Sequence, residues 1–461
     1  MTRIAIIGGG PGGYEAALVA AQLGAEVTLV ERDGPGGACV LTDCVPSKTL
    51  IATSTRMAVL SESASLGVQF SGGPDGEIGG LAIDLPLVDK RVRELAWAQS
   101  ADVDRRLAAA GVTVIRGEGR LASPRAVAVD GQRIDADMLL IATGATPRVL
   151  PGAEPDGERV LNWRQLYDLP GLPEELVVVG SGVTGVEFAS AYQALGSRVT
   201  LVSSRDRVLP HEDAAAATVL EDVFRRRGMN VLSRSRAAGV RRSGDGVVVT
   251  LVDGREVAGS HCLMTVGMVP NTRGIGLEEA GVRLDDRGFV VVDKVSRTSV
   301  GNVYAAGDCT GVLMLASVAA MQGRIAMWHA LGEAVQPLKL GWVAATIFTD
   351  PEVATVGVSQ QMIDSGEVVA RTVTLPLSTN ARAKMQGFLD GFVKIFCRPS
   401  TGIVLGGVIV APRASELVLG LSIAVQQHLT VDQLAHTFAV YPSLSGSLTE
   451  AGRRLMQDYP Y

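Results

Sequence analysis

One pattern occurs twice in this chain: an apolar strand, a glycine-rich turn, a helix and a second apolar strand. The turn of the first copy has the spacing G-x-G-x-x-G, at Gly8, Gly10 and Gly13. The first glycine permits a tight turn, the second lets the backbone approach a pyrophosphate, and the third lets the helix pack on the sheet. The free N–H groups at the start of the helix then face the phosphates. Two such units predict an α/β fold with two dinucleotide sites.

An acidic residue completes the first copy. Glu31 ends its second strand, 18 residues after Gly13. A carboxylate at this position accepts hydrogen bonds from the ribose hydroxyls of an adenosine. A glycine turn without a ligand would leave Glu31 unexplained, so we expect a bound dinucleotide here.

The second copy covers residues 176–209 and lacks the acid. Three glycines again form the turn: Gly180, Gly182 and Gly185. Ser203 stands at the position equivalent to Glu31. Polar and basic residues follow it: Ser204, Arg205 and Arg207. Hydroxyl and guanidinium groups attract a 2′-phosphate, which a carboxylate would repel. The pattern favours NADP(H) over NAD(H), and the alternative is that these arginines are solvated loop charges. Two dinucleotide sites indicate hydride transfer between a nicotinamide and a second redox dinucleotide, most simply FAD.

Composition narrows the class of protein. The 461 residues are 47% hydrophobic and 20% charged, as in a globular enzyme with a large core. The net charge of −6 gives no indication of binding to nucleic acid or to an anionic membrane surface. No apolar run reaches the roughly 18 residues that span a bilayer, and MTRIAIIGGG has no signal-peptide pattern. We therefore expect a cytoplasmic protein, in which five cysteines do not form a disulfide framework.

Four ordered motifs resemble those of the flavoprotein disulfide reductases, the family of lipoamide dehydrogenase, glutathione reductase and mercuric reductase. GGACVLTDCVPSK (36–48) resembles the redox-disulfide helix, and ATGATP (142–147) resembles the strand end that closes the first FAD segment. TSVGNVYAAGD (298–308) resembles the second FAD motif, and IFTDPEVATVG (347–357) resembles the start of the interface domain. The resemblance runs over nearly the whole chain.

The resemblance implies an α/β fold with two Rossmann-like dinucleotide-binding domains and a C-terminal α+β interface domain. Four segments follow from it: FAD-binding residues 1–147, NAD(P)-binding residues 148–268, an FAD-binding and central segment 269–338, and an interface domain 339–461. Family members are usually homodimers in which the C-terminal domain completes the partner's active site. The sequence leaves open whether two dimers associate. The segment SGGPDGEIGG, residues 71–80, is predicted to be a surface turn between helices.

The resemblance also implies which residues bind the cofactors. The residues implied for FAD, with Asp308 bonded to the ribityl chain, are Gly8, Gly10, Pro11, Gly13, Glu31, Arg32, Gly37, Ala38, Cys39, Cys44, Lys48, Ala142, Thr143, Gly144, Gly307, Asp308, Leu315, Ala316 and Ser317. Those implied for NAD(P) are Gly180, Gly182, Val183, Thr184, Gly185, Glu187, Ser203, Ser204, Arg205, Arg207, Val266 and Gly267. No metal site is expected, because the cysteine pair has no second ligand pair with zinc spacing.

Cys39 and Cys44 are the candidate redox pair. By resemblance, Cys44 is the thiol nearer the flavin and Cys39 attacks an incoming disulfide, while Lys48 lies near flavin N5 and pairs with Glu187. The residues themselves support reactivity, because a helix start and a nearby lysine favour a thiolate. The alternative is a pair of buried, inert thiols.

Disulfide exchange also needs an acid/base to protonate the departing thiol. The family supplies it near the C-terminus as a histidine held by a glutamate, in H-x-H-P-T-x-x-E. Here Tyr441 stands in place of that histidine and Gly446 in place of the glutamate. His436 and Glu450 are the available substitutes, and we expect neither to act well. A tyrosine, with an ordinary pKa of about 10, is a poor acid/base near neutral pH.

The sequence therefore predicts two intact cofactor sites and an impaired disulfide half-reaction. Mercury reduction is not expected, because the chain ends MQDYPY without the C-terminal cysteine pair of mercuric reductase. An actinobacterial branch of the family that acts as NAD(P)H:quinone reductase resembles this chain in lacking the histidine–glutamate pair. We expect an FAD-dependent NAD(P)H oxidoreductase that reduces a quinone-type small molecule. A disulfide reductase using Cys39 and Cys44, and a non-catalytic NADP(H)-binding flavoprotein, are the alternatives.

Overall fold

The computed structural model describes residues 1–68 and 82–457, so the turn predicted at 71–80 lies outside the described residues. The chain forms two compact units, each assembled from three stretches of sequence. The first unit comprises 1–49, 87–148 and 266–338, and the second comprises 50–86, 149–265 and 339–461.

A parallel sheet in the order β18-β7-β1-β2-β3 forms the centre of the first unit. Its strands are β1 (Arg3–Ile7), β2 (Glu26–Glu31), β3 (Thr113–Arg116), β7 (Met138–Ile141) and β18 (Val303–Ala305). Both faces of the sheet are covered, which explains why the strands are almost continuously apolar.

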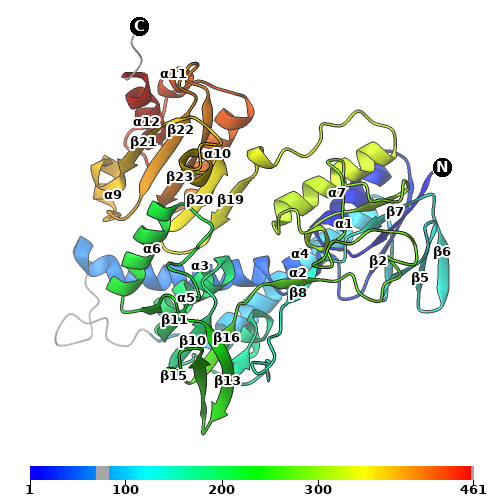
Figure 1. Ribbon diagram of the computed structural model, residues 1–461, viewed down its shortest axis with the longest axis horizontal. Helices are drawn as coiled ribbons and strands as arrows, with labels where there is room; N and C mark the ends of the chain where they lie inside the picture. Colours follow the sequence, from blue (N-terminus) through cyan, green and yellow to red (C-terminus); the bar gives the residue numbers. More distant parts are fainter. Residues whose placement is uncertain (69–81, 458–461) are drawn as a thin grey trace. The chain divides into compact units, whose positions relative to one another are not determined.

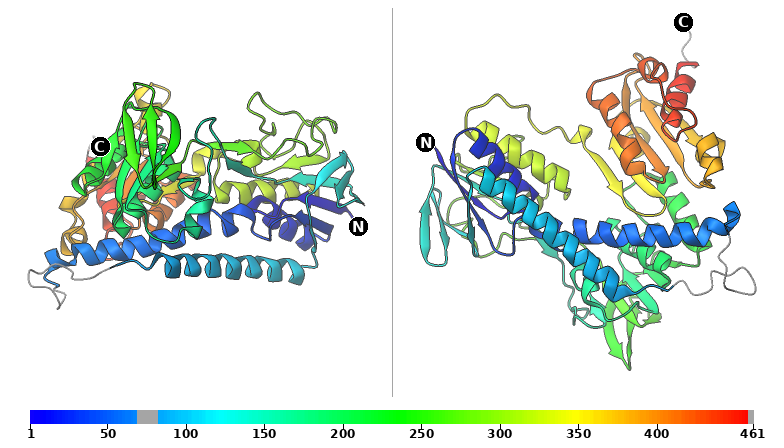
Figure 2. Two further views of the ribbon diagram at one scale, coloured as in Figure 1. Left: turned by 90° about the horizontal axis from the view of Figure 1, so that it is seen from below. Right: turned by 180° about the vertical axis from the view of Figure 1, so that it is seen from behind.

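Successive residues of the central strands contribute to two different cores. Ile4 and Ile6 pack with residues of α1 (Pro11–Gln22), α4 (Leu85–Ala109) and α7 (Ala316–Ala330). Ala5 and Ile7 point to the opposite face and pack with an antiparallel sheet. That sheet is formed by β4 (Arg120–Ser123), β5 (Ala126–Val129) and β6 (Gln132–Asp135). Figures 1 and 2 show α1 and α7 side by side along the parallel sheet.

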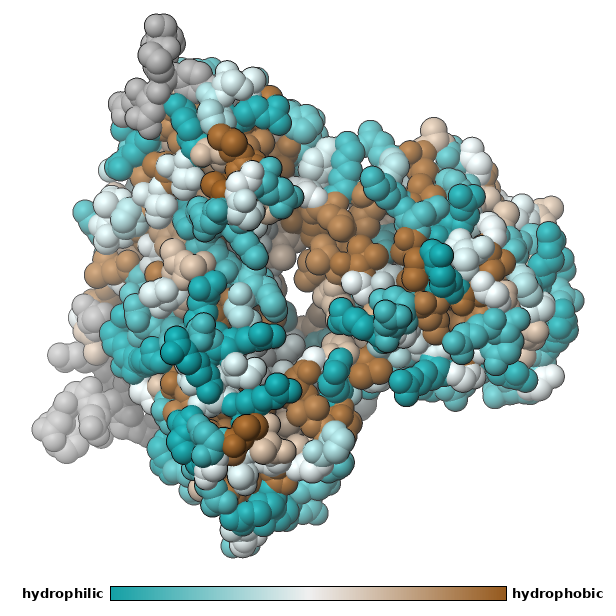
Figure 3. Space-filling model, viewed as in Figure 1, coloured by the Kyte–Doolittle hydropathy of each residue, from teal (hydrophilic) through white to brown (hydrophobic). Residues whose placement is uncertain are grey.

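Shorter elements of this unit carry the predicted site residues. They are α2 (Gly37–Leu41), the start of α3 (Cys44–Glu62), β8 (Ala145–Pro147), β17 (Met268–Pro270) and the 3₁₀ turn η3 (Asp308–Thr310). β8 and β17 pair as an antiparallel ribbon. Apolar side chains reach the surface around α7 in the view of Figure 3, and Leu313, Met314 and Met321 are among the exposed residues there.

The second unit contains another parallel sheet, in the order β12-β11-β10-β16-β9. Its strands are β9 (Val160–Leu161), β10 (Glu175–Val179), β11 (Arg198–Val202), β12 (Asn230–Leu232) and β16 (His261–Met264). The helices of this part are α5 (Val183–Leu195) and α6 (Ala214–Arg226), and 3₁₀ turns η1 (Ser63–Leu66) and η2 (Trp163–Asp168) accompany them. A separate antiparallel sheet consists of β13 (Ala237–Ser243), β14 (Gly246–Leu251) and β15 (Glu256–Gly259).

An antiparallel sheet in the order β19-β20-β23-β22-β21 completes this unit. Its strands are β19 (Ala344–Ile347), β20 (Glu352–Gly357), β21 (Arg371–Pro376), β22 (Phe392–Cys397) and β23 (Val404–Ala411). The elements around it are η4 (Leu340–Trp342), α8 (Gln360–Asp364), η5 (Leu377–Thr379), α9 (Ala381–Met385), α10 (Ala414–Gln426), α11 (Val431–Ala435) and α12 (Gly446–Gln457). Ile395 and Ile409 of the sheet pack with Leu421 of α10 and Leu455 of α12. The predicted α/β class with two dinucleotide-type sheets and a C-terminal α+β part is confirmed.

Candidate cofactor sites and the cysteine pair

The first glycine turn has the shape that a pyrophosphate requires. Gly8 has φ 101°, and a Cβ on it would overlap the carbonyl of Ala142. A Cβ on Gly13 would overlap the carbonyl of Gly8, so α1 can approach β1 only with glycine here. A Cβ on Gly10 would meet nothing within 4 Å, and Gly10 caps α1 without a side-chain hydrogen bond. The start of α1 therefore presents N–H groups to open space, which fits a bound phosphate group.

Glu31 holds this turn in place. Its Oε2 accepts a hydrogen bond from the Gly9 N–H, and its Oε1 accepts from the N–H groups of Asp33 (2.7 Å) and Gly34 (3.2 Å). Its side chain is buried. A carboxylate has about four acceptor positions, so one position on Oε2 remains for a ribose hydroxyl. The neighbouring Arg32 is exposed and bonds to Asp33.

The second glycine turn repeats this geometry in the second unit. Gly180 has φ 115°, and a Cβ on it would overlap the carbonyl of Thr265. A Cβ on Gly185 would overlap the carbonyl of Gly180, whereas one on Gly182 would meet nothing within 4 Å. Val183 and Thr184 begin α5, and Gly182 caps it without a side-chain bond. This turn also fits a pyrophosphate.

The loop after β11 divides into a buried and an exposed part. Ser203 is fully buried, and its hydroxyl lies 2.7 Å from that of Ser181. Exposed residues follow it: Ser204, Arg205 and Arg207. Asp206, which lies between the two arginines, is paired with Arg234 at 2.6 Å. The groups that remain to meet a 2′-phosphate are the exposed hydroxyl and the two guanidinium groups, and Ser203 supports the loop from inside.

The cysteine segment, residues 36–48, packs against the first glycine turn. The Gly36 N–H donates a 2.8 Å hydrogen bond to the carbonyl of Gly9, and a Cβ on Gly37 would lie 2.8 Å from the Cα of Gly10. Gly36 and Gly37 have φ of 96° and 57°, which lets the chain turn sharply into α2. Ala38 and Cys39 lie in α2, and Cys44 is the first residue of α3. The structure thus places the segment of Cys39 and Cys44 beside the first glycine turn.

The two thiols shift each other's pKa in opposite directions. A hydrogen bond from Cys44 lowers the pKa of Cys39, against burial and the carboxylates of Asp43 and Asp308. The same hydrogen bond, together with burial and the Cys39 charge, raises the pKa of Cys44. Once Cys39 is a thiolate, Cys44 is therefore held as a thiol. Lys48 favours the charged form of both.

Asp308 and the strand ends complete the first site. Asp308 follows Gly307, which has φ 84°, and burial together with Asp43 raises the pKa of Asp308 to about 6. The Thr143 carbonyl accepts a 2.8 Å bond from Asn271, which fixes the segment Ala142–Gly144. Leu315, Ala316 and Ser317 lie at the start of α7. Val266 and Gly267, which the resemblance implied for NAD(P), belong to the first unit, where the Gly267 carbonyl accepts a 2.9 Å bond from the Arg148 N–H.

Glu187 lies on α5 and is 4% exposed. Its Oε1 accepts a 2.8 Å hydrogen bond from the Phe348 N–H, at the end of β19. The Asp350 N–H donates to the Ser190 hydroxyl (3.3 Å) one turn further along α5. Two hydrogen bonds therefore join α5 to the motif IFTDPEVATVG. The pairing of Glu187 with Lys48 stays a prediction.

The C-terminal segment that should carry an acid/base carries an exposed tyrosine. Tyr441 is 85% exposed and precedes Pro442 through a cis peptide bond. Gly446 begins α12. The expected substitutes have other partners: His436 contacts the carbonyl of Asp432 (2.9 Å), and hydrogen bonds from Arg453 and Arg454 lower the pKa of Glu450 to about 2.

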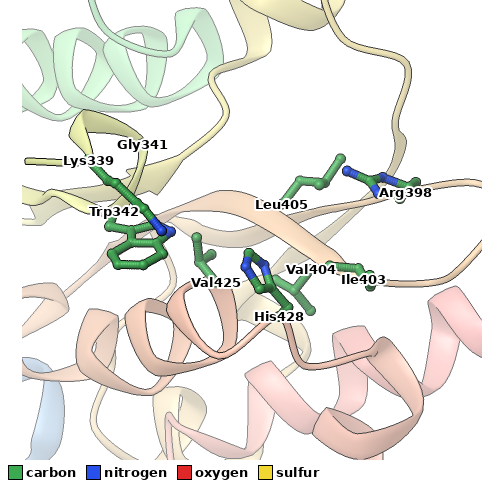
Figure 4. A pocket seen from close by; sticks show the side chains of 9 residues that line it. All are labelled: Lys339, Gly341, Trp342, Arg398, Ile403, Val404, Leu405, Val425 and His428. Carbon is green, nitrogen blue, oxygen red and sulfur yellow. The ribbon is translucent and has the colours of Figure 1, made fainter. Parts of the chain in front are cut away.

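A groove of about 450 Å³ lies elsewhere, on the C-terminal sheet (Figure 4). Its lining residues are Lys339, Gly341, Trp342, Arg398, Ile403, Val404, Leu405, Val425 and His428. The ammonium of Lys339 lies 3.8 Å from the centre of the Trp342 ring. None of the sequence-predicted site residues lines this groove, so it is separate from the cofactor turns.

The described ranges contain neither a metal-type cluster nor a membrane-spanning helix. No group of three or more histidines, cysteines or carboxylates there could hold a metal ion. No helix among these residues is long and apolar enough to cross a membrane.

Sequence reasoning missed Asp43, whose charge acts on both thiols and on Asp308. The signal was present, because Asp43 is an acidic residue directly before Cys44. The Phe348 N–H was also missed, and no local pattern could have paired it with Glu187.

Comparison with known proteins gives matches along the whole chain. Residues 2–323 match a family model described as pyridine nucleotide-disulphide oxidoreductase, and residues 343–452 match the dimerisation domain of that name. The NAD(P)H dehydrogenase (quinone) of Mycobacterium tuberculosis is 57% identical over 470 residues, covering 99% of this chain and 94% of that protein. A dihydrolipoyl dehydrogenase of Chlamydia pneumoniae is 32% identical over 458 residues, covering 99% and 97%.

Solved structures of two related proteins are also similar to this chain over nearly its whole length. The crystal structure of LpdA from Mycobacterium tuberculosis has a TM-score of 0.93 and 56% identity, covering 99% of this chain and 100% of that one. The HOCl-induced flavoprotein disulfide reductase RclA of Escherichia coli has a TM-score of 0.86 and 25% identity, covering 98% and 99%.

Proposed function

The chain belongs to the pyridine nucleotide-disulphide oxidoreductase family, and we propose that it is an FAD-dependent NAD(P)H:quinone oxidoreductase. The family implies FAD and a nicotinamide dinucleotide as its cofactors. Bound FAD would accept a hydride from NAD(P)H and pass the electrons to the acceptor. The protein's own part is to bind the two pyrophosphates at the glycine turns and to orient the reacting rings.

The observation that carries this proposal is that the C-terminal acid/base pair is replaced while both glycine turns keep their geometry. Tyr441 and Gly446 stand where disulfide exchange needs a histidine and a glutamate, and Glu450 is held by Arg453 and Arg454. Quinone reduction needs no departing thiol, so it does not need that acid/base. The 57% identical relative named NAD(P)H dehydrogenase (quinone) supports the same acceptor class.

Steady-state turnover of the purified FAD-loaded protein tests the proposal. With NADPH as donor, we expect clear reduction of a naphthoquinone and weak reduction of lipoamide. Clear turnover of lipoamide or glutathione disulfide with weak quinone turnover would overturn it. Rapid bleaching of the flavin by NADPH, followed by turnover, separates an enzyme from a non-catalytic NADP(H)-binding flavoprotein.

A disulfide reductase is the second candidate, because Cys39 and Cys44 act strongly on each other's pKa. A C39S variant distinguishes the two. Under the quinone proposal it keeps most of its quinone turnover, and under the alternative its main activity disappears.

The finer assignments belong to the same proposal. We assign the FAD residues named from the sequence to the first glycine turn. We assign the NAD(P) residues to the second turn, except that Ser203 supports its loop from inside and that Val266 and Gly267 belong to the first unit. We keep the four predicted segment boundaries. Preference for NADP(H) is supported by the exposed Ser204, Arg205 and Arg207. A homodimer is supported by the match to a dimerisation domain and by the exposed apolar side chains of Phe438 and Val440. Location in the cytoplasm remains a prediction from the sequence.

A further inference from the structure

A carboxylate occupies the turn between the two cysteines. Asp43 lies between α2 and α3, directly before Cys44. Its N–H donates a 2.8 Å hydrogen bond to the carbonyl of Ala38, and its own carbonyl accepts a 2.8 Å bond from the Ser47 N–H. The Thr42 N–H also bonds to Ala38, at 2.9 Å. The backbone of Asp43 is thus fixed to the helix of Cys39 on one side and to that of Cys44 on the other.

Four titratable groups of this unit act on the two thiols. Asp43 and Asp308 disfavour a charge on Cys39, whereas Lys48 favours it. Asp43 also disfavours a charge on Cys44. Tyr14, in the first turn of α1, lies near enough to Cys39 for a thiolate there to raise the tyrosine's pKa. Two carboxylates therefore oppose one lysine at a site that has to carry a thiolate to react with a disulfide.

We propose that Asp43 is a specificity-determining residue, which weakens the cysteine pair as a nucleophile and so restricts the enzyme to acceptors reduced without thiol exchange. This inference rests on the proposed quinone function and deepens it. Like charges held close together disfavour one another, and the nucleophile in disulfide exchange is the thiolate.

Asp43 opposes the attack of a thiolate on a disulfide. The Cys39 thiolate attacks one sulfur of the incoming disulfide, and the other sulfur leaves as a thiolate and takes a proton. The Cys44 thiol then loses its proton and attacks Cys39, which releases the second sulfur as a thiol and forms the Cys39–Cys44 disulfide. Two electrons pass from the cysteine pair to the substrate, and bound FAD with NAD(P)H would supply the two electrons that reduce the Cys39–Cys44 disulfide again. Negative charge forms next to Asp43 at both attacks.

The test compares D43N with D43E and with D104N, which removes an exposed carboxylate of α4 in the same unit. The FAD-loaded proteins are reduced under anaerobic conditions and treated with iodoacetamide at a pH about two below the midpoint of the wild-type alkylation profile. Alkylation of the Cys39 peptide is followed by mass spectrometry. We expect the rate in D43N to rise roughly tenfold, as expected when a thiol pKa falls by about one, and D43E and D104N to remain near the wild type.

Turnover provides the second readout. The ratio of lipoamide to naphthoquinone turnover should rise about as much in D43N as the alkylation rate, and the gain should disappear in C39S/D43N. Equal alkylation rates in D43N and D104N would overturn the proposal, as would fast alkylation in D43E or an unchanged turnover ratio in D43N. Failure of the quinone function itself would show separately, as absent quinone turnover in the wild type.

Discussion

The Phe348 N–H donates a 2.8 Å hydrogen bond to the buried carboxylate of Glu187. This bond joins the helix that starts at the second glycine turn to the end of β19 in the C-terminal sheet. The Ser190 hydroxyl makes a parallel connection with the Asp350 N–H. The position of α5 therefore depends on backbone groups about 160 residues further along the chain.

Removing the Glu187 carboxylate should destabilise this connection. E187A leaves the half-buried Phe348 N–H without this acceptor, and we expect a loss of about 1–3 kcal/mol in the free energy of unfolding. E187Q keeps an oxygen acceptor and should lose less. Thermal melts of the two variants and the wild type measure the difference, and equal melting temperatures for E187A and wild type would contradict it.

The exposed guanidinium groups after β11 should select the nicotinamide cofactor. In an R205A/R207A variant we expect kcat/KM for NADPH to fall roughly tenfold or more, the size of one lost charge-assisted bond, with little change for NADH. R242A is the matched control, because Arg242 is half-exposed in the same unit and pairs with Asp156 and Glu158. Equal losses with both nucleotides, or a strong NADH preference of the wild type, would refute NADP(H) selection.

Restoring the acid/base pair should restore disulfide chemistry. A Cβ on Gly446 would meet only the Ser443 hydroxyl, at 3.5 Å, and a glutamate at the start of α12 suits the helix dipole. We expect lipoamide turnover in Y441H/G446E to exceed the wild type by at least tenfold, within the roughly 10²–10⁴-fold that such groups contribute. Y441H alone should gain less, because its imidazole lacks the glutamate. Unchanged lipoamide turnover in the double variant would argue that the missing acid/base is not the limiting defect.

The raised pKa of Asp308 should appear as a pH dependence of stability in protein stripped of FAD. Burial and Asp43 raise that pKa to about 6, above the roughly 4 of an unfolded aspartate. Between these values the folded chain keeps a proton that the unfolded chain has released, so the free energy of unfolding falls as the pH rises from about 4 to about 6.

The D308N variant lacks this carboxyl group, so its stability should fall less over the same pH range. We expect the free energy of unfolding of D308N, relative to that of the wild type, to rise by roughly 1–3 kcal/mol between pH 4.5 and pH 7. Chemical denaturation at the two pH values measures it. A constant gap would mean that Asp308 ionises normally.

The sequence alone predicted those features that depend on spacing along the chain. The glycine positions, Glu31 at the end of β2 and the cysteines at the starts of helices follow from local rules of turn and helix geometry. Ser203 shows the limit of such rules, because spacing placed it at the cofactor while burial directs its hydroxyl to Ser181. Asp43 and Phe348 act through charge and tertiary contact, which a linear pattern does not encode.

The hydrogen bond from Gly36 to Gly9 bears on how such a chain can change over evolutionary time. The turn before the cysteines stabilises the first glycine turn, so mutations that disrupt it would also weaken cofactor binding. Selection for the flavin alone would then preserve the segment around both cysteines after their redox use had declined. The presence of Cys39 and Cys44 is therefore not by itself evidence that this protein reduces disulfides.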